Sequence, residues 1–270
     1  MLKHKRLEHS FVAEHDPAYC FESQMTNTSS IPSDSVTIIG AGRLGRALAA
    51  ALAASETPVR GPLRRGEWEG GISANEIVLL CVPDGEVARV ARAIEADAIV
   101  GHCAGAMTLD PLSPHRGFSL HPLLAITGDQ TRFDGAAAAI AATGDETLSI
   151  ARALARSLGM TPIAIADADR TLYHAAAVLA SNYLVALEET AATIGARVGL
   201  ERRHLATLAE SALSNWARDG AASLTGPIVR GDAAVVDRQR KEIAVEFPDL
   251  LPLWDALTDR TRTIAAGVRS

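Results

Sequence analysis

A glycine-rich segment at residues 36–45 constrains the fold of this chain more than any other feature. It reads Val-Thr-Ile-Ile-Gly-Ala-Gly-Arg-Leu-Gly, so three glycines follow a short apolar run in the spacing Gly-x-Gly-x-x-Gly. In this motif Gly40 permits a tight turn, Gly42 lets a pyrophosphate approach the main chain, and Gly45 lets a helix pack closely on a strand. Because an apolar run precedes the motif and a helical pattern follows it, the segment predicts the strand, turn and helix that bind a dinucleotide.

The residues around this motif favour NADP as the dinucleotide. N–H groups at the start of the predicted helix would bind the phosphates, with Arg43 and Leu44 as further contacts. About 20 residues on, where proteins that use NAD carry an acid, the sequence has Arg64 and Arg65 and no acid before Glu67. Guanidinium groups suit a 2′-phosphate because they form bidentate charged hydrogen bonds. We therefore predict NADP; NAD, with two solvated arginines, is the less favoured alternative.

Apolar runs alternate with helical segments in the first two thirds of the chain. The runs that predict strands are Val36–Ile39, a run near Val59–Arg65, Ile77–Val82, Ala98–His102, Gly117–His121, Ala136–Ala142 and Thr161–Ala166. The predicted helices are Arg43–Ala54 and Asp145–Leu158, the second with Asp145 as N-cap and Gly159 at its end. Only Gly66–Asn75 joins the second strand to the third, so the crossover helix there is truncated. Continuous apolar strands between helices predict a parallel sheet covered on both faces.

The strand pattern stops after residue 166. Helical periodicity then covers Thr171–Val198, Glu201–Ala217, Val229–Val245 and Asp249–Val268. The sequence therefore predicts an α/β fold, in which a Rossmann-type parallel sheet precedes an all-helical C-terminal domain. We expect a disordered or flexible extension at 1–34, an NADP-binding domain at 35–166 and a helical domain for substrate binding and dimerisation at 167–270.

Composition argues against several classes of function. The net charge is −6 and no basic block occurs beyond the first six residues, so clustered cations that could neutralise nucleic acid phosphates are missing. The cysteines, Cys20, Cys81 and Cys103, are too few and dispersed for a disulfide framework or a zinc site. The most apolar helical segment, Ala175–Leu187, is too short to span a membrane, and no signal peptide opens the chain. We expect a cytoplasmic protein that acts on a small molecule.

Ligands of such sheets bind outside the carboxyl ends of the strands. Val82, Pro83 and Cys103 follow predicted strands, which makes them candidate cofactor contacts. Cys103 has the character of a small buried residue, because hydride transfer needs no thiolate nucleophile. His121 ends a later strand, where its imidazole could serve as a general acid near the nicotinamide. A histidine that is hydrogen bonded to the loop backbone is an equally good interpretation.

Five segments together resemble the Rossmann-like proteins that carry a C-terminal domain of unknown function 2520. They are the glycine motif, Val78–Asp84, His102–Ala106, Ser119–Pro122 and Leu224–Asp232. The resemblance covers nearly all of the chain after residue 34. It implies an architecture similar to that of ketopantoate reductase, pyrroline-5-carboxylate reductase and the β-hydroxyacid dehydrogenases, and an NADP-dependent oxidoreductase activity. It also implies that the helical domain contributes to the active-site cleft and to a homodimer.

The catalytic element of the β-hydroxyacid dehydrogenases departs from its usual form here. Those proteins carry a Lys-x-x-x-Asn pair on the first long helix of the second domain. Asn182 matches the asparagine, but Val178 occupies the position of the lysine. His174 lies about two turns before Asn182, close to the same helical face. We predict that His174 and Asn182 take over proton donation and substrate orientation, unless they are simply the polar face of an amphipathic helix.

Three further residues are candidate substrate contacts: Ser181, Thr225 and Arg230, the last for a carboxylate or a phosphate. The predicted function is an NADP-dependent oxidoreductase that transfers hydride to or from a small 2-keto or 2-hydroxy acid or an imine. The alternative is an NADP(H)-binding sensor with little catalytic activity. A sensor would need the same glycine motif and arginines but would tolerate changes at His121 and His174.

Overall fold

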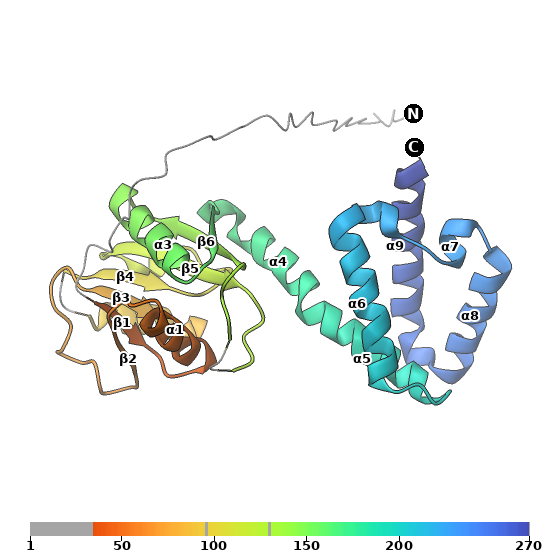
Figure 1. Ribbon diagram of the computed structural model, residues 1–270, viewed down its shortest axis with the longest axis horizontal. Helices are drawn as coiled ribbons and strands as arrows, with labels where there is room; N and C mark the ends of the chain where they lie inside the picture. The colour runs from red at the N-terminus through yellow and green to blue at the C-terminus, as the bar shows by residue number, and fades with distance from the viewer. Residues whose placement is uncertain (1–34, 95–96, 129–130, 270) are drawn as a thin grey trace, which may run out of the picture.

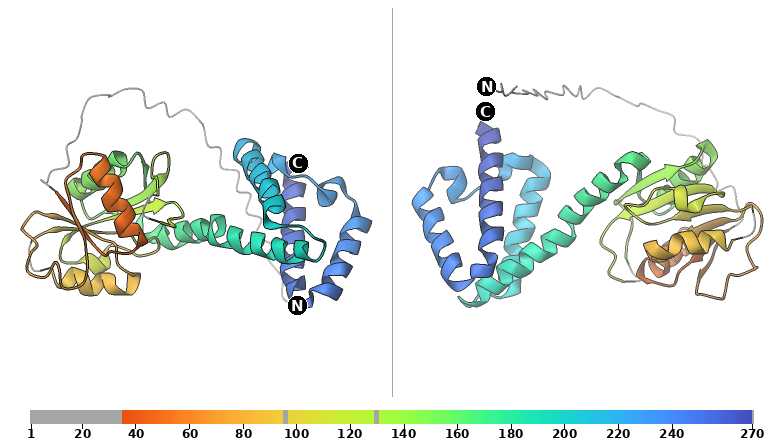
Figure 2. Two further views of the ribbon diagram at one scale, coloured as in Figure 1. Left: turned by 60° about the horizontal axis from the view of Figure 1, so that its bottom comes forward. Right: turned by 180° about the vertical axis from the view of Figure 1, so that it is seen from behind.

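The computed structural model describes residues 35–94, 97–128 and 131–269 in two lobes (Figure 1). The predicted N-terminal extension, including Cys20, lies outside the described residues. An α/β lobe comes first and a helical lobe follows. The two views in Figure 2 show that α4 (Arg170–Ala180) and α5 (Asn182–Ala196) run from one lobe to the other.

The α/β lobe is built on a seven-stranded sheet with the strand order β2-β1-β3-β4-β5-β6-β7. The strands are β1 (Val36–Ile39), β2 (Val59–Leu63), β3 (Ile77–Leu80), β4 (Ile99–His102), β5 (Arg116–Leu123), β6 (Ala137–Ala142) and β7 (Thr161–Ala164). The predicted parallel sheet is confirmed for the other strand pairs, whereas β5 pairs with β6 in the antiparallel direction. The described residues between these two strands form no helix, and a parallel return would need a long crossover.

Two apolar layers cover the sheet. One contains side chains of α1 (Arg43–Ala54) and α3 (Asp145–Ser157) packed on the strands. The other contains side chains of α2 (Asp84–Arg92) together with Trp68. The sequence patterns did not identify α2. This short helix matters for the site, because it begins directly after the loop that follows β3.

Trp68 replaces the crossover helix that a sheet of this kind usually has after its second strand. The predicted truncation is confirmed, since the residues between β2 and β3 form only turns. The Trp68 indole is 3% exposed and packs in the same apolar layer as α2. One large side chain therefore covers the surface that a helix would cover elsewhere.

Two helix boundaries differ from the predicted ones. Asp145 is the first residue of α3, and the N-cap is Gly144. The Thr147 hydroxyl accepts the Gly144 N–H at 3.2 Å and donates to the Gly144 carbonyl oxygen at 3.0 Å, so no aspartate cap is needed. The predicted helix Thr171–Val198 is interrupted at Ser181, which separates α4 from α5.

The helical lobe consists of α5 and four later helices. These are α6 (Arg202–Asp219), α7 (Pro227–Arg230), α8 (Ala233–Glu246) and α9 (Leu251–Arg269). Gly231, at φ 78°, ends α7 in the left-handed region and so divides what the sequence suggested was one helix. Among the described helices, none combines the length and the apolar character that a membrane crossing requires.

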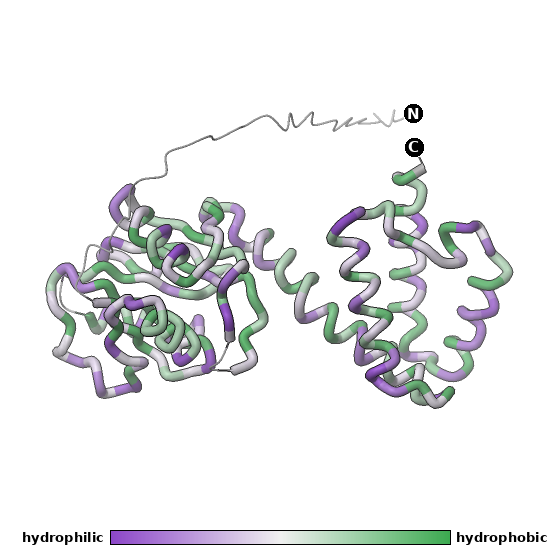
Figure 3. The backbone as a smooth tube through the Cα atoms, viewed as in Figure 1, coloured by the Kyte–Doolittle hydropathy of each residue, from purple (hydrophilic) through white to green (hydrophobic). Residues whose placement is uncertain are grey.

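The helical lobe buries few of its apolar side chains. Beyond Arg170, the apolar side chains buried in the described part of the chain are Val236, Ile243 and Ala265. Figure 3 shows hydrophobic residues along α4, α5 and α6. Six large apolar side chains on these helices are at least 60% exposed: Leu172, Leu179, Tyr183, Val185, Leu208 and Trp216. We refer to these six as the apolar face. Exposed apolar surface on this scale is typical of an interaction site.

We expect Trp68→Ala to lower the free energy of unfolding by about 3–5 kcal/mol, because it leaves a large cavity against the sheet. Urea denaturation followed by circular dichroism measures the change. Glu69→Ala is the matched control, since Glu69 is exposed beside it in the same turn. Equal stabilities of the two variants would show that Trp68 does not replace the missing helix.

Candidate active site

Two of the three motif glycines are required by close packing inside the protein. Gly40 has φ 117°, and a Cβ there would collide with the carbonyl oxygen of Cys81. A Cβ on Gly45 would collide with the carbonyl oxygen of Gly40. Gly42 differs, because a Cβ on it would meet no atom within 4 Å. The structure therefore separates two glycines that close the turn from one that faces open space.

The turn presents main-chain N–H groups to that open space. Gly42 is the N-cap of α1; its helix has no side-chain cap and no acidic residue in the first turn. The first N–H groups of a helix have no partner within it and lie at the positive end of its dipole. Arg46 stabilises the turn, since its Nη1 donates a hydrogen bond to the Ala41 carbonyl oxygen at 2.6 Å. Leu44 packs against the core, and Arg43 is exposed beside Gly42.

A cavity of about 250 Å³ adjoins the turn and reaches the predicted arginines. Its lining includes the candidate cofactor contacts Arg64, Arg65, Val82 and Pro83, together with Trp68 and Arg89. Arg89 was missed because it lies on α2. Glu67, the first acid after the arginines, accepts the Arg64 main-chain N–H at 2.7 Å. Its carboxylate therefore closes the local turn.

Glu86 lies between two of these guanidinium groups. Its Oε2 is 3.2 Å from Arg65 Nη2 and 2.6 Å from Arg89 Nη2. The hydrogen bond and the charge of Arg89, with a smaller effect of Arg65, hold the pKa of Glu86 below its usual value. The cluster is therefore two cations and one anion, with Arg64 nearby. Such a group can bind a further anion at the mouth of the cavity.

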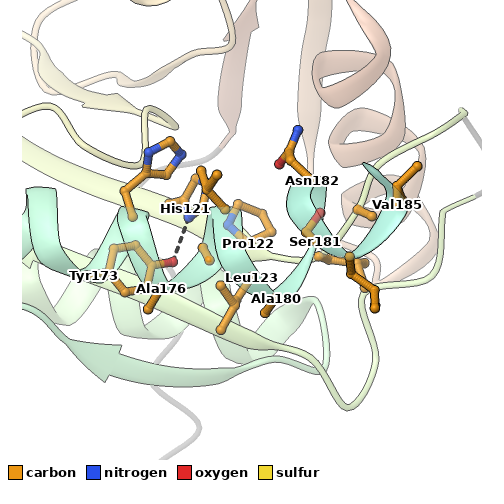
Figure 4. A pocket seen from close by; sticks show the side chains of 15 residues that line it. His121, Pro122, Leu123, Tyr173, Ala176, Ala180, Ser181, Asn182 and Val185 are labelled. Atoms are coloured by element: carbon orange, nitrogen blue, oxygen red, sulfur yellow. Dashed lines mark hydrogen bonds between the residues drawn. The ribbon is translucent and has the colours of Figure 1, made fainter. Parts of the chain in front are cut away.

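A second and larger cavity lies between the end of β5 and the break between α4 and α5. Its volume is about 630 Å³, and Figure 4 shows the side chains around it. The polar side chains of its lining are His121, Tyr173, His174, Ser181 and Asn182. The rest of the lining is proline, alanine, leucine and valine, and it includes no Asp, Glu, Lys or Arg.

His121 has two aromatic neighbours on α4. Its Nδ1 lies 2.7 Å from the Tyr173 hydroxyl oxygen, and the two groups share the hydrogen bond drawn in Figure 4. The ring centroid of His174 is 5.8 Å away in an edge-on arrangement. A Cβ on Gly105 would lie 3.0 Å from His121 Nε2 and 2.9 Å from His174 Nε2. Both imidazoles thus converge on a glycine in the loop after β4, where a larger residue would displace them.

His121 and Tyr173 are uncharged at neutral pH. Burial, and then the proximity of His174 and Arg170, lowers the pKa of His121 to about 4. Burial raises the pKa of Tyr173, so its hydroxyl keeps the proton. The sequence patterns did not identify Tyr173; only its place directly before His174 could have suggested it.

Arg170 fixes α4 against the sheet. Its side chain is 0% exposed and donates to the Ser119 hydroxyl at 2.7 Å and to the Ala104 carbonyl oxygen at 2.9 Å. The nearby Asp167 accepts the Leu109 main-chain N–H at 3.1 Å. These bonds join the start of α4 to β5 and to the loop after β4. Arg170 therefore positions Tyr173 and His174 opposite His121.

His102 is a structural histidine in the same region. It is 0% exposed; its Nδ1 accepts the Ala104 N–H at 3.2 Å and its Nε2 lies 3.1 Å from the Thr108 carbonyl oxygen. These bonds fix the neutral tautomer with the proton on Nε2. Burial lowers the pKa of His102 to about 4. The residue shapes the loop after β4.

The structure brings together four of the predicted catalytic and substrate residues. His121, His174, Ser181 and Asn182 line one cavity. Cys103 is buried, as expected of a small core residue. Thr225 and Arg230 lie in the helical lobe and are absent from the lining of this cavity. Arg230 Nε is 3.1 Å from Asp232 Oδ2. The roles of all these residues stay predictions.

Solved structures define the fold. The chain superposes with a TM-score of 0.73 on a proposed NADP oxidoreductase from Bacteroides fragilis, at 19% identity, over 87% of this chain and 100% of the other. It superposes on a Thermotoga maritima protein with a TM-score of 0.72 at 25% identity, over 87% and 100%. A Streptomyces aurantiacus imine reductase gives a TM-score of 0.59 at 14% identity, over 87% and 99%. The fold is therefore that of a Rossmann-like protein with a helical C-terminal lobe.

The match to a family model lies in the C-terminal part of the chain. Residues 136–261 match the domain of unknown function DUF2520, which confirms the resemblance predicted from the sequence. The match begins just before β6 and so includes the last two strands. No curated protein matches the sequence.

We expect acid to destabilise the protein between pH 6.5 and about 4. In this range the unfolded chain binds protons at His102 and His121 that the folded chain does not, so stability falls as the pH falls. Each histidine contributes up to about 3 kcal/mol. Urea denaturation at a series of pH values measures the slope, which His121→Asn should reduce. An unchanged slope in this variant, with the exposed His204→Asn for comparison, would contradict the assignment.

Proposed function

We propose that this protein is an NADP-dependent oxidoreductase that reduces the C=O or C=N bond of a small uncharged substrate. The observation that carries the proposal is the pairing of two sites at one edge of the sheet. An open glycine turn lies at the end of β1, and a cavity with neutral proton donors lies at the end of β5. Substrates and dinucleotides of such sheets bind at this edge.

The glycine turn suits the diphosphate of the dinucleotide. The N–H groups at the start of α1 bind it, and open space at Gly42 admits it. Arg64, Arg65 and Arg89 bind the 2′-phosphate. The acid that would prefer a free 2′-hydroxyl is occupied, because Glu67 bonds to the main chain of Arg64. NADPH supplies the hydride when bound. The likeness to the proposed NADP oxidoreductase of Bacteroides fragilis agrees with this choice of cofactor.

The residues of the larger cavity supply the proton that the reduction consumes. Reduction of C=O or C=N places an electron pair on oxygen or nitrogen, which must take up one proton. Tyr173 and His121 share a hydrogen bond, so a proton given to the substrate by one can be replaced through the other. His174 lies beside His121, and Asn182 offers its amide to orient the substrate. A general acid of this kind contributes about 10²- to 10⁴-fold to the rate.

The lining of this cavity favours a substrate without a carboxylate. It includes no basic side chain, and burial keeps the His121 imidazole neutral at pH 7. An anion placed in such an apolar cavity would lose its hydration without gaining a cation. An uncharged imine or ketone meets no such penalty. Of the two predicted substrate classes, the cavity therefore supports the imine better than the 2-keto acid.

We propose that a second copy of this chain covers the apolar face, which extends over α4, α5 and α6. Three buried apolar side chains are few for the described part of the chain after Arg170, while the six large side chains of the apolar face are at least 60% exposed. Burial of each of these large side chains contributes about 1.5–3 kcal/mol. A homodimer would supply the core that one copy lacks.

Nucleotide binding is the first test. Isothermal titration calorimetry should show tighter binding of NADPH than of NADH to the wild-type protein. Gly42→Ala should weaken NADPH binding at least tenfold while the Tm stays unchanged, because its methyl group clashes with the ligand and not with the protein. Gly267→Ala, an open glycine on α9, is the control. Tighter binding of NADH would contradict the role of the arginines, and no binding of either nucleotide would refute the proposal.

Turnover tests the proton donors. Tyr173→Phe should lower kcat by about 10²-fold or more and leave the Kd for NADPH unchanged. Tyr183→Phe, an exposed tyrosine on α5, is the control. Substrates are offered in pairs, a cyclic imine or ketone with and without a carboxylate. Preference for the carboxylated member, together with a raised KM in Arg230→Ala, would refute the uncharged class. Nucleotide binding without turnover of any pair would favour the sensor.

The oligomeric state tests the apolar face. Sedimentation equilibrium should give the mass of a dimer for the wild-type protein and of a monomer for Leu208→Glu, because a buried unpaired carboxylate opposes association. Arg262→Glu, a charge change on α9 outside the apolar face, should remain a dimer. A monomeric wild-type protein would leave the apolar face without its proposed partner and refute this part.

A further inference from the structure

Two thiols lie side by side beneath the glycine turn. Leu80 and His102 are the last paired residues of the parallel strands β3 and β4. Cys81 and Cys103 follow them directly, and their sulfur atoms are 3.8 Å apart. Neither cysteine has a role in the proposed reduction. Their proximity nevertheless places a pair of oxidisable groups next to the turn of the proposed nucleotide site, because Cys81 contacts Gly40 and Gly45.

Cys81 is packed against the turn by both its main chain and its side chain. Its N–H donates to the Ile39 carbonyl oxygen at 2.7 Å, and its own carbonyl oxygen lies against Gly40. The Cys81 Cβ is 3.2 Å from the position of a Cβ on Gly45. The space between the cysteine and the turn is therefore full. A displacement of Cys81 must displace the turn.

The two thiols differ in their exposure to solvent. Cys103 is buried, whereas Cys81 is partly exposed. Contact with the Cys81 thiol, and then burial, raises the pKa of Cys103, so Cys103 is a poor first target. An oxidant from solvent reaches Cys81 first, and Cys103 is the thiol in place to react with the product.

We propose that Cys81 and Cys103 form a reversible disulfide that weakens nucleotide binding at the glycine turn. The oxidant class is a hydroperoxide. Hydrogen peroxide converts the Cys81 thiol to a sulfenic acid and releases one water, and the Cys103 sulfur then displaces the sulfenic oxygen as a second water. The two thiols lose two hydrogens and two electrons, and the peroxide takes up both. A dithiol reductant reverses the reaction by exchange.

Bond formation has to bring the two sulfur atoms closer together. A disulfide requires the sulfur atoms to be about 2.05 Å apart, against 3.8 Å between these two thiols. Cys103 lies in the packed core, so most of the movement falls on Cys81 and on the glycines in contact with it. The consequence for nucleotide affinity rests on the proposed function, whereas the formation of the bond does not.

The test uses the full chain with Cys20→Ser, so that two thiols remain. The protein is treated with hydrogen peroxide and measured by intact mass, thiol titration and NADPH calorimetry. We expect both thiols to disappear with a mass loss of two hydrogens, and the Kd for NADPH to rise at least tenfold. Dithiothreitol should restore both values. Cys103→Ser, or Cys103→Ala if the serine variant does not fold, should show no such mass loss.

The outcomes separate this inference from the proposed function. Two titratable thiols after peroxide treatment would overturn the disulfide. A disulfide with unchanged NADPH affinity would overturn the switch. Failure of the reduced protein to bind NADPH would refute the proposed function and the switch with it, while the mass measurement would still decide whether Cys81 and Cys103 form a bond.

Discussion

The buried guanidinium of Arg170 is the interaction on which the geometry of the larger cavity depends. It bonds to the Ser119 hydroxyl and to the Ala104 carbonyl oxygen, which belong to β5 and to the loop after β4. A buried cation is stabilised by hydrogen bonds and by a nearby anion. Both terminal nitrogens of Arg170 are bonded, whereas its buried Nε has no hydrogen-bond partner among the described residues, and Asp167 is close enough to raise the pKa that burial lowers. The helix α4 is thereby fixed in angle and rotation. Without that constraint, the rings that meet above Gly105 would have no reason to converge.

Local patterns were sufficient to predict most of the α/β lobe. The glycine motif specified β1, the turn and α1, because each part depends on neighbouring residues and on packing that only glycine permits. Features that depend on residues far apart in the sequence were harder to predict. The reversal between β5 and β6 depends on what fills their connection, and the apolar runs of the two strands do not specify their relative direction. The helix α2 is amphipathic but has nine residues, which is shorter than the helices of about 10–12 residues or more that periodicity identifies.

The candidate site was predicted in part for a related reason. His121 was found because it ends a strand, and His174 and Asn182 because a family motif marks their helix. Tyr173 and Arg170 were missed because their roles arise from contacts with residues far away in the sequence, and Arg89 was missed because it lies on α2, which the sequence patterns did not identify. The bond between Tyr173 and His121 joins positions 52 residues apart. Such a pairing is visible only after the topology has placed α4 against β5.

The interruption at Ser181 has a consequence for the chemistry of the cavity wall. A helix that stops and restarts leaves some of its last carbonyl groups and some of its next N–H groups without partners inside the helix. Such main-chain groups lie beside a cavity lining in which most residues are apolar, and there they supply polarity without charge. Side-chain replacement cannot delete them. The apolar residues of the wall can therefore change during evolution while the main-chain groups remain available for hydrogen bonds to a ligand.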